Sequence, residues 1–491
     1  MLHLRQQPKA VRIRDAQSLR GDPLHPAQPT YSAYAQAFRC IGPACEDTCC
    51  QGWNVPIDRV SYEKFQSLPS SPLRTLIADS VSRNVESAPT GTDLVHRAPE
   101  SKTAVFAQIR IDAAGHCPLL TADRLCRIHA ELGEEMLPRT CSTYPRIVHE
   151  YGGVSETALA LSCPEAARLV LLNRDLLAAK PQSLQQPAVN LLRDSPQQTD
   201  PAQGNNALPH DFQSIRASIL ALVQTRSYPL WQRIFLLGLM CRRLDSIARG
   251  ELKRSVPEFL ADFKAAVRAG ALRAAMETLP VDRPAQLDVV LRLAGLLLHR
   301  SSVGPRFAAC VQAFTTGIGN GPGATLESLT RQYTLAHDSS FEPFVRRHPH
   351  ILENYLINTI IRCQFPFGRE GIEPGATPRM SLEFARLTAQ FVLIRGLLIG
   401  VAGFHGAAFS TQHVVSTVQA AAKHFEHHPE FLKLSCELLV ESQMDGARGM
   451  AILLRNTEPG TTATEQPRAH QPVPNPPGPS TGVSAWKGPT P

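Results

Sequence analysis

The feature that most constrains this 491-residue chain is the distribution of its twelve cysteines. Eight of them lie in two groups near the N-terminus, and the other four are scattered singly through apolar sequence. The first group is Cys40-x4-Cys45-x3-Cys49-Cys50, and the second contains Cys117, Cys126, Cys141 and Cys163. Cysteines at this density in one segment indicate disulfides or a metal site rather than core packing.

The rest of the sequence favours metal ligation over disulfides. Disulfide-rich domains are typically small and secreted, whereas the basic N-terminal sequence of this chain shows no apolar segment followed by a small-residue cleavage site. The apolar stretch Phe391–Ala402 is too short for a transmembrane helix, which needs about 18 apolar residues, and it carries Arg395. We therefore expect a cytoplasmic protein without a membrane partner, whose thiols stay reduced.

The spacing of the cysteines leaves the identity of the metal open. Zinc sites commonly use two C-x2–4-C pairs, and the first group lacks a C-x2-C pair. Iron–sulfur clusters also take four thiolates but tolerate more varied spacing. Eight thiols suffice for two sites of four ligands, or for one site with the remaining thiols packed beside it.

Several ordered sequence blocks carry a resemblance to a known family. They are Phe38–Asp58, Cys117–His129, Cys141–Arg146, Cys163–Arg168 and, far downstream, Pro349–Phe367. In these blocks, and in their order along about residues 31–450, the chain resembles the bacterial flagellin lysine-N-methylases. The cysteine part alone is more loosely similar to zinc- or iron-chelating proteins with a C-x2-C-x3-C-C motif, from which it departs because four residues separate the first two cysteines.

The resemblance implies an enzyme that methylates lysine ε-amines of flagellin, its protein partner in the bacterial flagellum. It implies S-adenosylmethionine as methyl donor and an iron–sulfur cluster, 4Fe-4S in type, in the cysteine module. All eight N-terminal cysteines are candidate ligands, with a subset of four expected at each site. Spacing and composition by themselves support only a cysteine-ligated metal site on a helical protein, with zinc as the alternative metal.

A binding turn for the methyl donor is not recognisable in the sequence. Nucleotide-binding turns join a β-strand to a helix through closely spaced glycines. The glycine-rich segment Gly317–Gly323 follows helical sequence and contains Pro322, so it predicts a loop between helices. Under the family resemblance, the cluster itself becomes a candidate anchor, because an iron with an open position can chelate the amino and carboxylate groups of S-adenosylmethionine.

Three further residues are candidates for the reaction. Glu353 and Tyr355 lie in an apolar helical segment, and either is a candidate base or orienting group for an amine that must lose a proton before it attacks. The alternative is a helix-packing motif with a buried hydrogen bond. Arg146, beside the cysteines, is a candidate partner for the donor carboxylate, or it offsets the negative charge of the thiolates.

Composition divides the chain into five parts. We expect a flexible arm at 1–30, a cysteine-rich module at 31–176, a linker at 177–210, a helical domain at 211–456 and a disordered tail at 457–491. Apolar residues recur at helical spacing in the fourth part. The predicted fold class is mainly α, with a cysteine-rich metal-binding N-terminal module followed by an irregular helical bundle.

Within the module, the sequence predicts short extended pieces at Trp53–Ile57 and Val105–Ile111 and helices at Ser61–Gln66 and Glu165–Asn173. The Ser, Pro and Thr content of the segment Pro69–Arg97 predicts a surface excursion.

Charge also limits the function. The net charge of +7 is spread along the chain rather than gathered into a dense basic stripe, which argues against nucleic-acid binding. It is compatible with an acidic protein partner. The alternative to a methylase is a non-catalytic protein in which zinc staples the N-terminal module and the helical part binds a partner. A redox sensor that loses its cluster in air is a third hypothesis.

Overall fold

The structure is a computed structural model that describes part of the chain. The described residues are 33–83, 106–113, 115–151, 154–177, 211–298, 304–368, 379–426 and 428–456. The predicted arm, the predicted tail and all of the predicted linker except residue 177 lie outside them.

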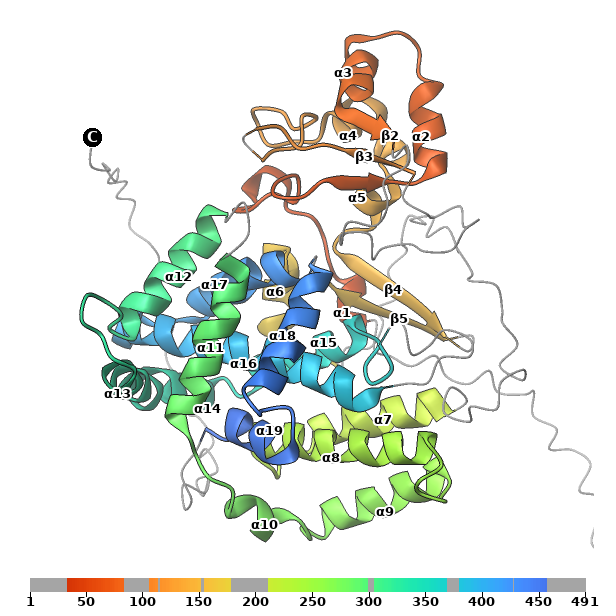
Figure 1. The fold of residues 1–491 in the computed structure, drawn as a ribbon. Helices are drawn as coiled ribbons and strands as arrows, with labels where there is room; N and C mark the ends of the chain where they lie inside the picture. Colours follow the sequence, from red (N-terminus) through yellow and green to blue (C-terminus); the bar gives the residue numbers. More distant parts are fainter. Residues whose placement is uncertain are drawn as a thin grey trace, which may run out of the picture. The chain divides into compact units, whose positions relative to one another are not determined.

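Helices dominate the described residues, which confirms the predicted mainly α fold (Figure 1). The helices before the linker are α1 (Ala33–Gln36), α2 (Arg59–Gln66), α3 (Pro72–Ser80), α4 (Arg127–Leu132), α5 (Arg139–Thr143) and α6 (Pro164–Leu171). Those after it are α7 (Phe212–Val223), α8 (Leu230–Ala248), α9 (Val256–Arg268), α10 (Arg273–Glu277), α11 (Arg283–Leu298), α12 (Pro305–Gly317), α13 (Leu326–Ala336), α14 (Glu342–Arg347), α15 (His350–Arg362), α16 (Met380–His405), α17 (Thr411–Phe425), α18 (Pro429–Glu441) and α19 (Ala447–Leu454). A π-helical turn, His337–Phe341, joins α13 to α14.

Strands occur in two small antiparallel sheets within the described ranges. One sheet has the order β1-β3-β2, and the other is a hairpin of β4 and β5. The strands are β1 (Val55–Ile57), β2 (Val81–Arg83), β3 (Ala107–Ile109), β4 (Arg146–Tyr151) and β5 (Val154–Leu159). Val55 and Val81 both lie opposite Ile109, and Arg146 lies opposite Leu159. The predicted extended pieces near Ile57 and Ile109 are therefore strands of one sheet.

The residues before the linker contribute to two hydrophobic cores. A small core contains Val55, Ile57, Ile109 and Ile128, and the side chains of Cys50, Cys117, Cys126 and Cys141 belong to it or pack against it. Tyr34, Leu159 and Val170 instead belong to the large core formed by the helices. The sheet β1-β3-β2 thus builds a separate apolar support for the cysteines, while α1, β5 and α6 are packed into the helical part.

The helical part is organised around α16. Helices α8, α11, α12, α13, α17 and α18 all contact it (Figure 1), and its residues from Phe384 to Ala402 are almost all buried. Glycines allow α12 to approach closely, because a Cβ added at Gly317 would lie 1.8 Å from the carbonyl oxygen of Gly400. An alanine at this crossing would force the two helices apart.

α16 is longer than the predicted apolar stretch. Met380–Ala408 is long and apolar enough to cross a membrane, with a mean hydropathy of 1.8 over 18 residues, so the expectation that this stretch is too short was wrong. However, 89% of that window is buried inside the fold. The Arg395 guanidinium is also buried and donates a hydrogen bond of 2.6 Å to the carbonyl oxygen of Leu454. Both observations are typical of a core helix that packs against protein on all sides.

The segment Pro69–Arg97, predicted as a surface excursion, contains regular structure in its described part. Residues 72–80 form α3, with Leu73 and Ile77 buried, and β2 follows directly. Ser71 accepts a hydrogen bond from the amide of Arg74, and Pro72 occupies the first helical position. Serine and proline here are helix-start signals, and composition alone did not reveal them. Residues 84–97 lie outside the described part.

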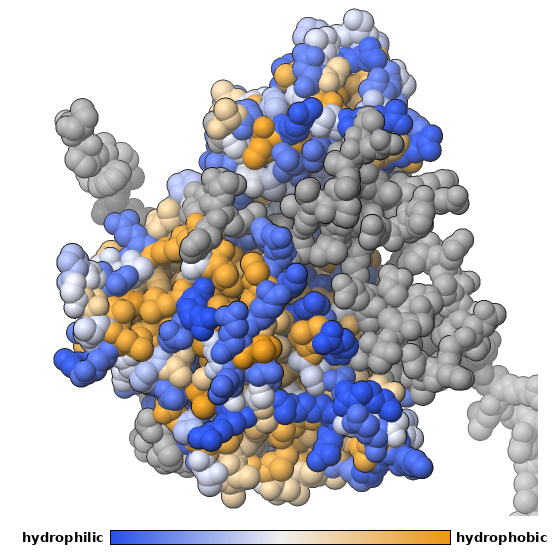
Figure 2. Space-filling model, in the orientation of Figure 1, coloured by the Kyte–Doolittle hydropathy of each residue, from blue (hydrophilic) through white to orange (hydrophobic). Residues whose placement is uncertain are grey.

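The helical part exposes some hydrophobic surface. Figure 2 shows hydrophobic residues gathered over the helices that Figure 1 labels α11 and α12. Leu298, Leu335 and Phe404 are among the exposed large hydrophobic side chains of the helices, and Leu335 is 59% exposed. Hydrophobic exposure of this kind is common on folded proteins.

Candidate functional site

Five of the eight N-terminal cysteines lie close to one another. The amide of Cys117 donates a hydrogen bond of 2.8 Å to the carbonyl oxygen of Cys50, which follows Cys49 directly. Cys126 is the N-cap residue of α4, and Cys141 lies in α5. We call Cys49, Cys50, Cys117, Cys126 and Cys141 the inner thiol group. It is assembled from four segments of the chain on the small N-terminal core.

The thiols of the inner group influence one another's protonation. Burial raises the pKa of Cys117 to about 11, and the charges of Cys126 and Cys49 add to the effect. Burial also raises the pKa of Cys141 well above its ordinary value, again with contributions from Cys126, Cys49 and Cys117. Desolvation and like charges both disfavour thiolates, so these side chains need a nearby cation in order to ionise. A bound metal provides such a charge.

The other three N-terminal cysteines form a second set, which we call the outer thiol group: Cys40, Cys45 and Cys163. Burial raises the pKa of Cys45, and the charges of Cys49 and Cys40 contribute. Burial raises the pKa of Cys163 to about 12, with further contributions from Cys45 and Cys49. Cys49 therefore interacts with both groups.

The donor chemistry suits a soft metal or an iron–sulfur cluster, since every side chain in the two groups is a thiol. All twelve cysteines are free thiols, without disulfide bonds. Within the described residues, however, no three or more side chains of His, Cys, Asp or Glu are arranged as ligands around one point. The thiols are thus gathered in one region without being placed around a common point.

A lysine in α17 binds the loop that contains Cys45 and Cys49, and no pattern in the sequence predicted this contact. The ammonium of Lys423 lies 2.7 Å from a carboxylate oxygen of Asp47 and donates a second hydrogen bond to the carbonyl oxygen of Thr48. Gln419, one helical turn earlier, donates a hydrogen bond of 2.7 Å to the other carboxylate oxygen of Asp47. The hydrogen bond with Cys50 and burial raise the pKa of Cys49 well above its ordinary value, and the charge of Lys423 opposes part of this rise. From sequence alone, a single lysine in an amphipathic helix cannot be distinguished from one that points into solvent.

Arg146 is tied to Phe38 rather than to a thiol by its described contacts. Its guanidinium donates a hydrogen bond of 2.9 Å to the carbonyl oxygen of Phe38 and lies over the ring of the same residue, 5.1 Å from its centroid. Burial and the charge of Arg39 lower its pKa. Arg146 thus holds the segment leading to Cys40 against β4, and its predicted role toward a donor carboxylate stays a prediction.

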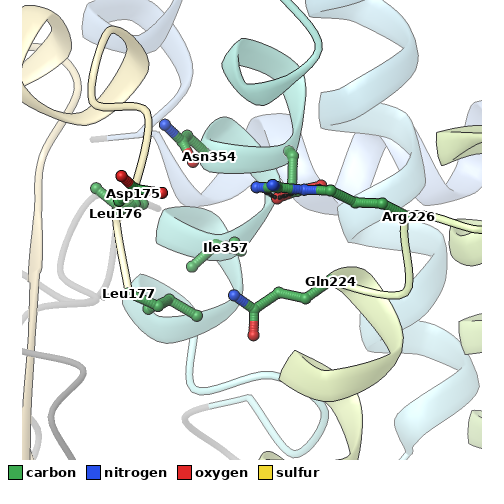
Figure 3. Close-up of a pocket in the computed structure, with 8 residues that line it drawn as sticks. Asp175, Leu176, Leu177, Gln224, Arg226, Asn354 and Ile357 are labelled. Carbon is green, nitrogen blue, oxygen red and sulfur yellow. Dashed lines mark hydrogen bonds and ion pairs between the residues drawn. The ribbon is translucent and has the colours of Figure 1, made fainter. Parts of the chain in front are cut away.

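Glu353 accepts hydrogen bonds from two arginines in the interior of the helical part. Arg226 and Arg233 approach its carboxylate oxygens to 2.8 Å and 2.6 Å. Burial alone would raise the pKa of Glu353, but the hydrogen bonds and charges of these arginines lower it below its ordinary value. The side chain borders a cavity of about 200 Å³, also lined by Asp175 and Asn354 (Figure 3). A carboxylate held in this way is a poor proton acceptor, so the geometry favours the packing alternative.

Tyr355 lies on a different face of α15 and is fully buried. Burial raises its pKa, and its hydroxyl has no hydrogen-bond partner among the described residues. Such a group cannot reach a lysine on another protein without a large rearrangement. For Tyr355, too, the geometry favours a packing role.

A buried polar chain connects the thiols with the helices, and the sequence analysis missed it. The hydroxyl of Tyr144 lies 3.1 Å from that of Ser162, and the amide of Ser162 donates a hydrogen bond of 3.2 Å to Glu426. Glu426 also forms a buried ion pair of 3.2 Å with Arg362. Burial raises the pKa of Glu426. Glu426, unlike Glu353, is therefore a carboxyl group whose affinity for protons is increased.

A larger cavity opens beside the inner thiol group. Its volume is about 500 Å³, and Cys117 forms part of its wall. The lining comes from residues 46–51, from residues 112–124 and from the first turn of α12. Its charged side chains are those of Glu46, Asp47, Asp112, Arg124 and Arg306. We call it the Arg306 pocket.

Comparison with known proteins defines the class of this chain. A model of the FliB lysine N-methylase C-terminal domain matches residues 216–453. Over 281 residues, the chain is 26% identical to the proteins named lysine-N-methylase from Salmonella typhimurium and Salmonella choleraesuis. That alignment covers 56% of this chain and 63% of each relative. No solved structure matches the chain.

A third relative gives the stronger identity. The chain is 31% identical over 150 residues to the flagellar biosynthetic protein FliU of Salmonella muenchen, covering 30% of this chain and 80% of FliU. The chain belongs to the FliB family of lysine N-methylases, which confirms the resemblance found in the sequence.

Proposed function

We propose that the protein is a lysine N-methylase that transfers a methyl group from S-adenosylmethionine to lysine ε-amines of flagellin in the cytoplasm. The observation that carries this proposal is the match of residues 216–453 to the FliB lysine N-methylase C-terminal domain. The names of the relatives, which refer to lysine methylation and to flagellar biosynthesis, support the substrate class.

The chemistry requires a neutral amine. The lysine ammonium gives its proton to a base, and its nitrogen then attacks the methyl carbon of the sulfonium. A nitrogen–carbon bond forms while the carbon–sulfur bond breaks, and the electron pair of that bond remains on sulfur in S-adenosylhomocysteine. Neither buried carboxyl group described above serves as this base without rearrangement: two arginines hold Glu353, and Glu426, whose pKa burial raises, is as inaccessible as Tyr355 and is paired with Arg362.

We also propose that the inner thiol group holds an iron–sulfur cluster, with zinc as the alternative. Cys117, Cys126 and Cys141, together with Cys49 or Cys50, would supply four thiolate ligands. When bound, a cluster would supply positive charge to the desolvated thiolates, and an iron would stay open to the donor only where three of these thiols are its ligands. The raised pKa values of Cys117 and Cys141 support the need for such a charge.

The test combines metal analysis with methyl transfer. Protein purified without oxygen is analysed for iron, sulfide and zinc, and for a broad absorption band in the visible range. The same preparation is then incubated with S-adenosylmethionine and its own flagellin, and tryptic peptides are analysed by mass spectrometry. Methyl-lysine that depends on the donor supports the proposal. Its absence with metal-loaded protein and unmethylated flagellin contradicts it.

One observation favours a second function. The described strands form only small antiparallel sheets, so the described residues contain no parallel sheet of the kind that commonly binds nucleotides. A non-catalytic protein with a zinc-stapled N-terminal module needs no such sheet. That alternative predicts a colourless protein with stoichiometric zinc and no affinity for S-adenosylmethionine.

A further inference from the structure

The Arg306 pocket borders the inner thiol group, because Cys117 forms part of its wall. Its volume of about 500 Å³ lies within the roughly 300–1,000 Å³ that is usual for ligand sites. Several of its lining residues are exposed, among them Arg124, so the pocket opens at the surface. A side chain of another protein that enters the pocket therefore comes close to the proposed metal ligands.

The backbone of Arg124 has a conformation that is unusual for an arginine. Its φ angle is 62°, in the left-handed region that favours glycine. The residue closes a turn, in which its amide donates a hydrogen bond of 2.9 Å to the carbonyl oxygen of Thr121. Glycine would close this turn with less strain, so the turn itself does not explain an arginine. An unfavourable backbone conformation at a pocket supports a functional role for the side chain that it presents.

The guanidinium groups of Arg124 and Arg306 contact only neutral partners among the described residues. One nitrogen of Arg124 donates a hydrogen bond to the carbonyl oxygen of Cys45. Two nitrogens of Arg306 donate to the side chains of Gln419 and Ser416, at 3.0 and 3.4 Å. A guanidinium has five N–H donors. Each arginine therefore keeps donors and an uncompensated positive charge for a ligand.

The carboxylates that line the pocket are already engaged. Asp47 pairs with Lys423, and Glu46 pairs with Arg168. Asp112 accepts a hydrogen bond of 2.9 Å from a backbone amide and takes part in a further interaction. The charge that the pocket offers to a ligand is therefore that of its two arginines, which attract a carboxylate and repel a cation.

We infer that the Arg306 pocket binds lysines of the protein substrate that stand next to an aspartate or glutamate, with Arg124 and Arg306 binding the neighbouring carboxylate. The inference rests on the proposed methylase function and adds a rule for which lysines are modified. A lysine ammonium alone meets like charge at the two arginines. A carboxylate beside it offsets this repulsion and accepts charge-assisted hydrogen bonds.

The experiment varies the residues beside one methylated lysine of the protein's own flagellin. Both neighbours of that lysine are replaced by aspartate, by asparagine or by arginine, and the other methylated lysines of the same molecule serve as internal standards. Initial rates of methylation by metal-loaded full-length protein are measured by mass spectrometry.

We expect the lysine between aspartates to be methylated roughly 5- to 25-fold faster than the lysine between asparagines, because each exposed ion pair contributes up to about fivefold. The lysine between arginines should be the slowest of the three. Equal rates beside aspartate and asparagine would overturn the inference, while the methylation itself would uphold the proposed function. If no lysine of flagellin is methylated, the proposed function fails and the inference fails with it.

Variants of Arg124 separate recognition from folding. Arg124→Gly removes the side chain where the backbone suits glycine, so the fold should tolerate it, and the preference for aspartate should fall about fivefold. Arg124→Glu should abolish the preference, because its carboxylate repels the aspartate that Arg306 attracts. Melting curves verify that both variants are folded.

The matched control is Arg59→Glu, which makes the same change in net charge at an exposed arginine that pairs with Glu63 outside the pocket. It should keep the wild-type preference for aspartate. A preference that is unchanged in both folded Arg124 variants, or that falls equally in Arg59→Glu, would overturn the inference.

Discussion

Replacing Glu353 by glutamine should destabilise the fold far more than it slows any reaction. The substitution removes the negative charge that Arg226 and Arg233 share. Arg233 has only 7% of its side chain exposed, whereas Arg226 is 60% exposed. Removing the partner of a buried charge costs about 3–5 kcal/mol, and an exposed ion pair contributes at most about 1 kcal/mol. We expect a loss of about 3 kcal/mol, nearly all of it due to Arg233.

Urea denaturation of the full-length protein measures this loss. The matched variant Arg226→Gln should cost no more than about 1 kcal/mol, because it leaves the buried pair of Glu353 and Arg233 intact. The double variant Glu353→Gln/Arg233→Met should recover part of the stability, since it removes both buried charges. A Glu353→Gln protein with wild-type stability but a methyl-transfer rate reduced 100-fold or more would refute the structural role and restore Glu353 as the base.

Three further predictions follow, two from the site and one from His337, a buried histidine in the π-helical turn between α13 and α14. Cys126→Ser should lose most bound metal by elemental analysis, whereas Cys241→Ser, in the distant helical core, should keep it; equal metal in both variants contradicts the ligand assignment. Lys423→Met should accelerate amide hydrogen exchange in the loop before β1, whereas Lys433→Met, at an exposed lysine, should not. Equal exchange rates in the two variants would contradict the role of the Lys423–Asp47 contact in holding this loop. Burial lowers the pKa of His337 to about 4, whereas the pKa in the unfolded chain is about 6.5. The folded protein therefore keeps its full stability above pH 6.5. It loses about 3 kcal/mol in total as the pH falls from 6.5 toward 4, because the unfolded chain takes up the proton first. Urea midpoints at pH 7.5 and 5 should therefore differ less in His337→Gln than in the wild type, and an unchanged difference contradicts this assignment.

Local sequence signals predicted many of the elements. The apolar residues from Phe384 to Leu398 lie in α16, the predicted helix Ser61–Gln66 lies in α2, and most of the predicted helix Glu165–Asn173 lies in α6. These signals work because helix periodicity and caps depend on residues a few positions apart. The same local signals were present at α3, where Ser71 and Pro72 begin a helix, but they were outweighed by loop-like composition.

The contacts between side chains that are far apart in the sequence could not be predicted. Nothing near Glu353 in sequence points to Arg226 and Arg233, and nothing near Asp47 points to Lys423. The cysteine pattern predicted a shared site but not which thiols lie together, because the grouping depends on how β1, β3, α4 and α5 pack on the small core. A single sequence contains the interacting residues but carries no signal of which distant pairs come into contact.

The contact between Asp47 and Lys423 has a consequence for how the protein is made. Asp47 leaves the ribosome 376 residues before Lys423. At a synthesis rate of about 5–20 residues per second, the loop that contains Asp47 is made roughly 20 to 75 s before α17, the helix that binds it. During that time its thiols are open to oxidation or to the wrong metal. Cell-free synthesis under oxygen should therefore damage the nascent chain more than the finished protein, and a chain truncated before α17 should remain in the vulnerable state.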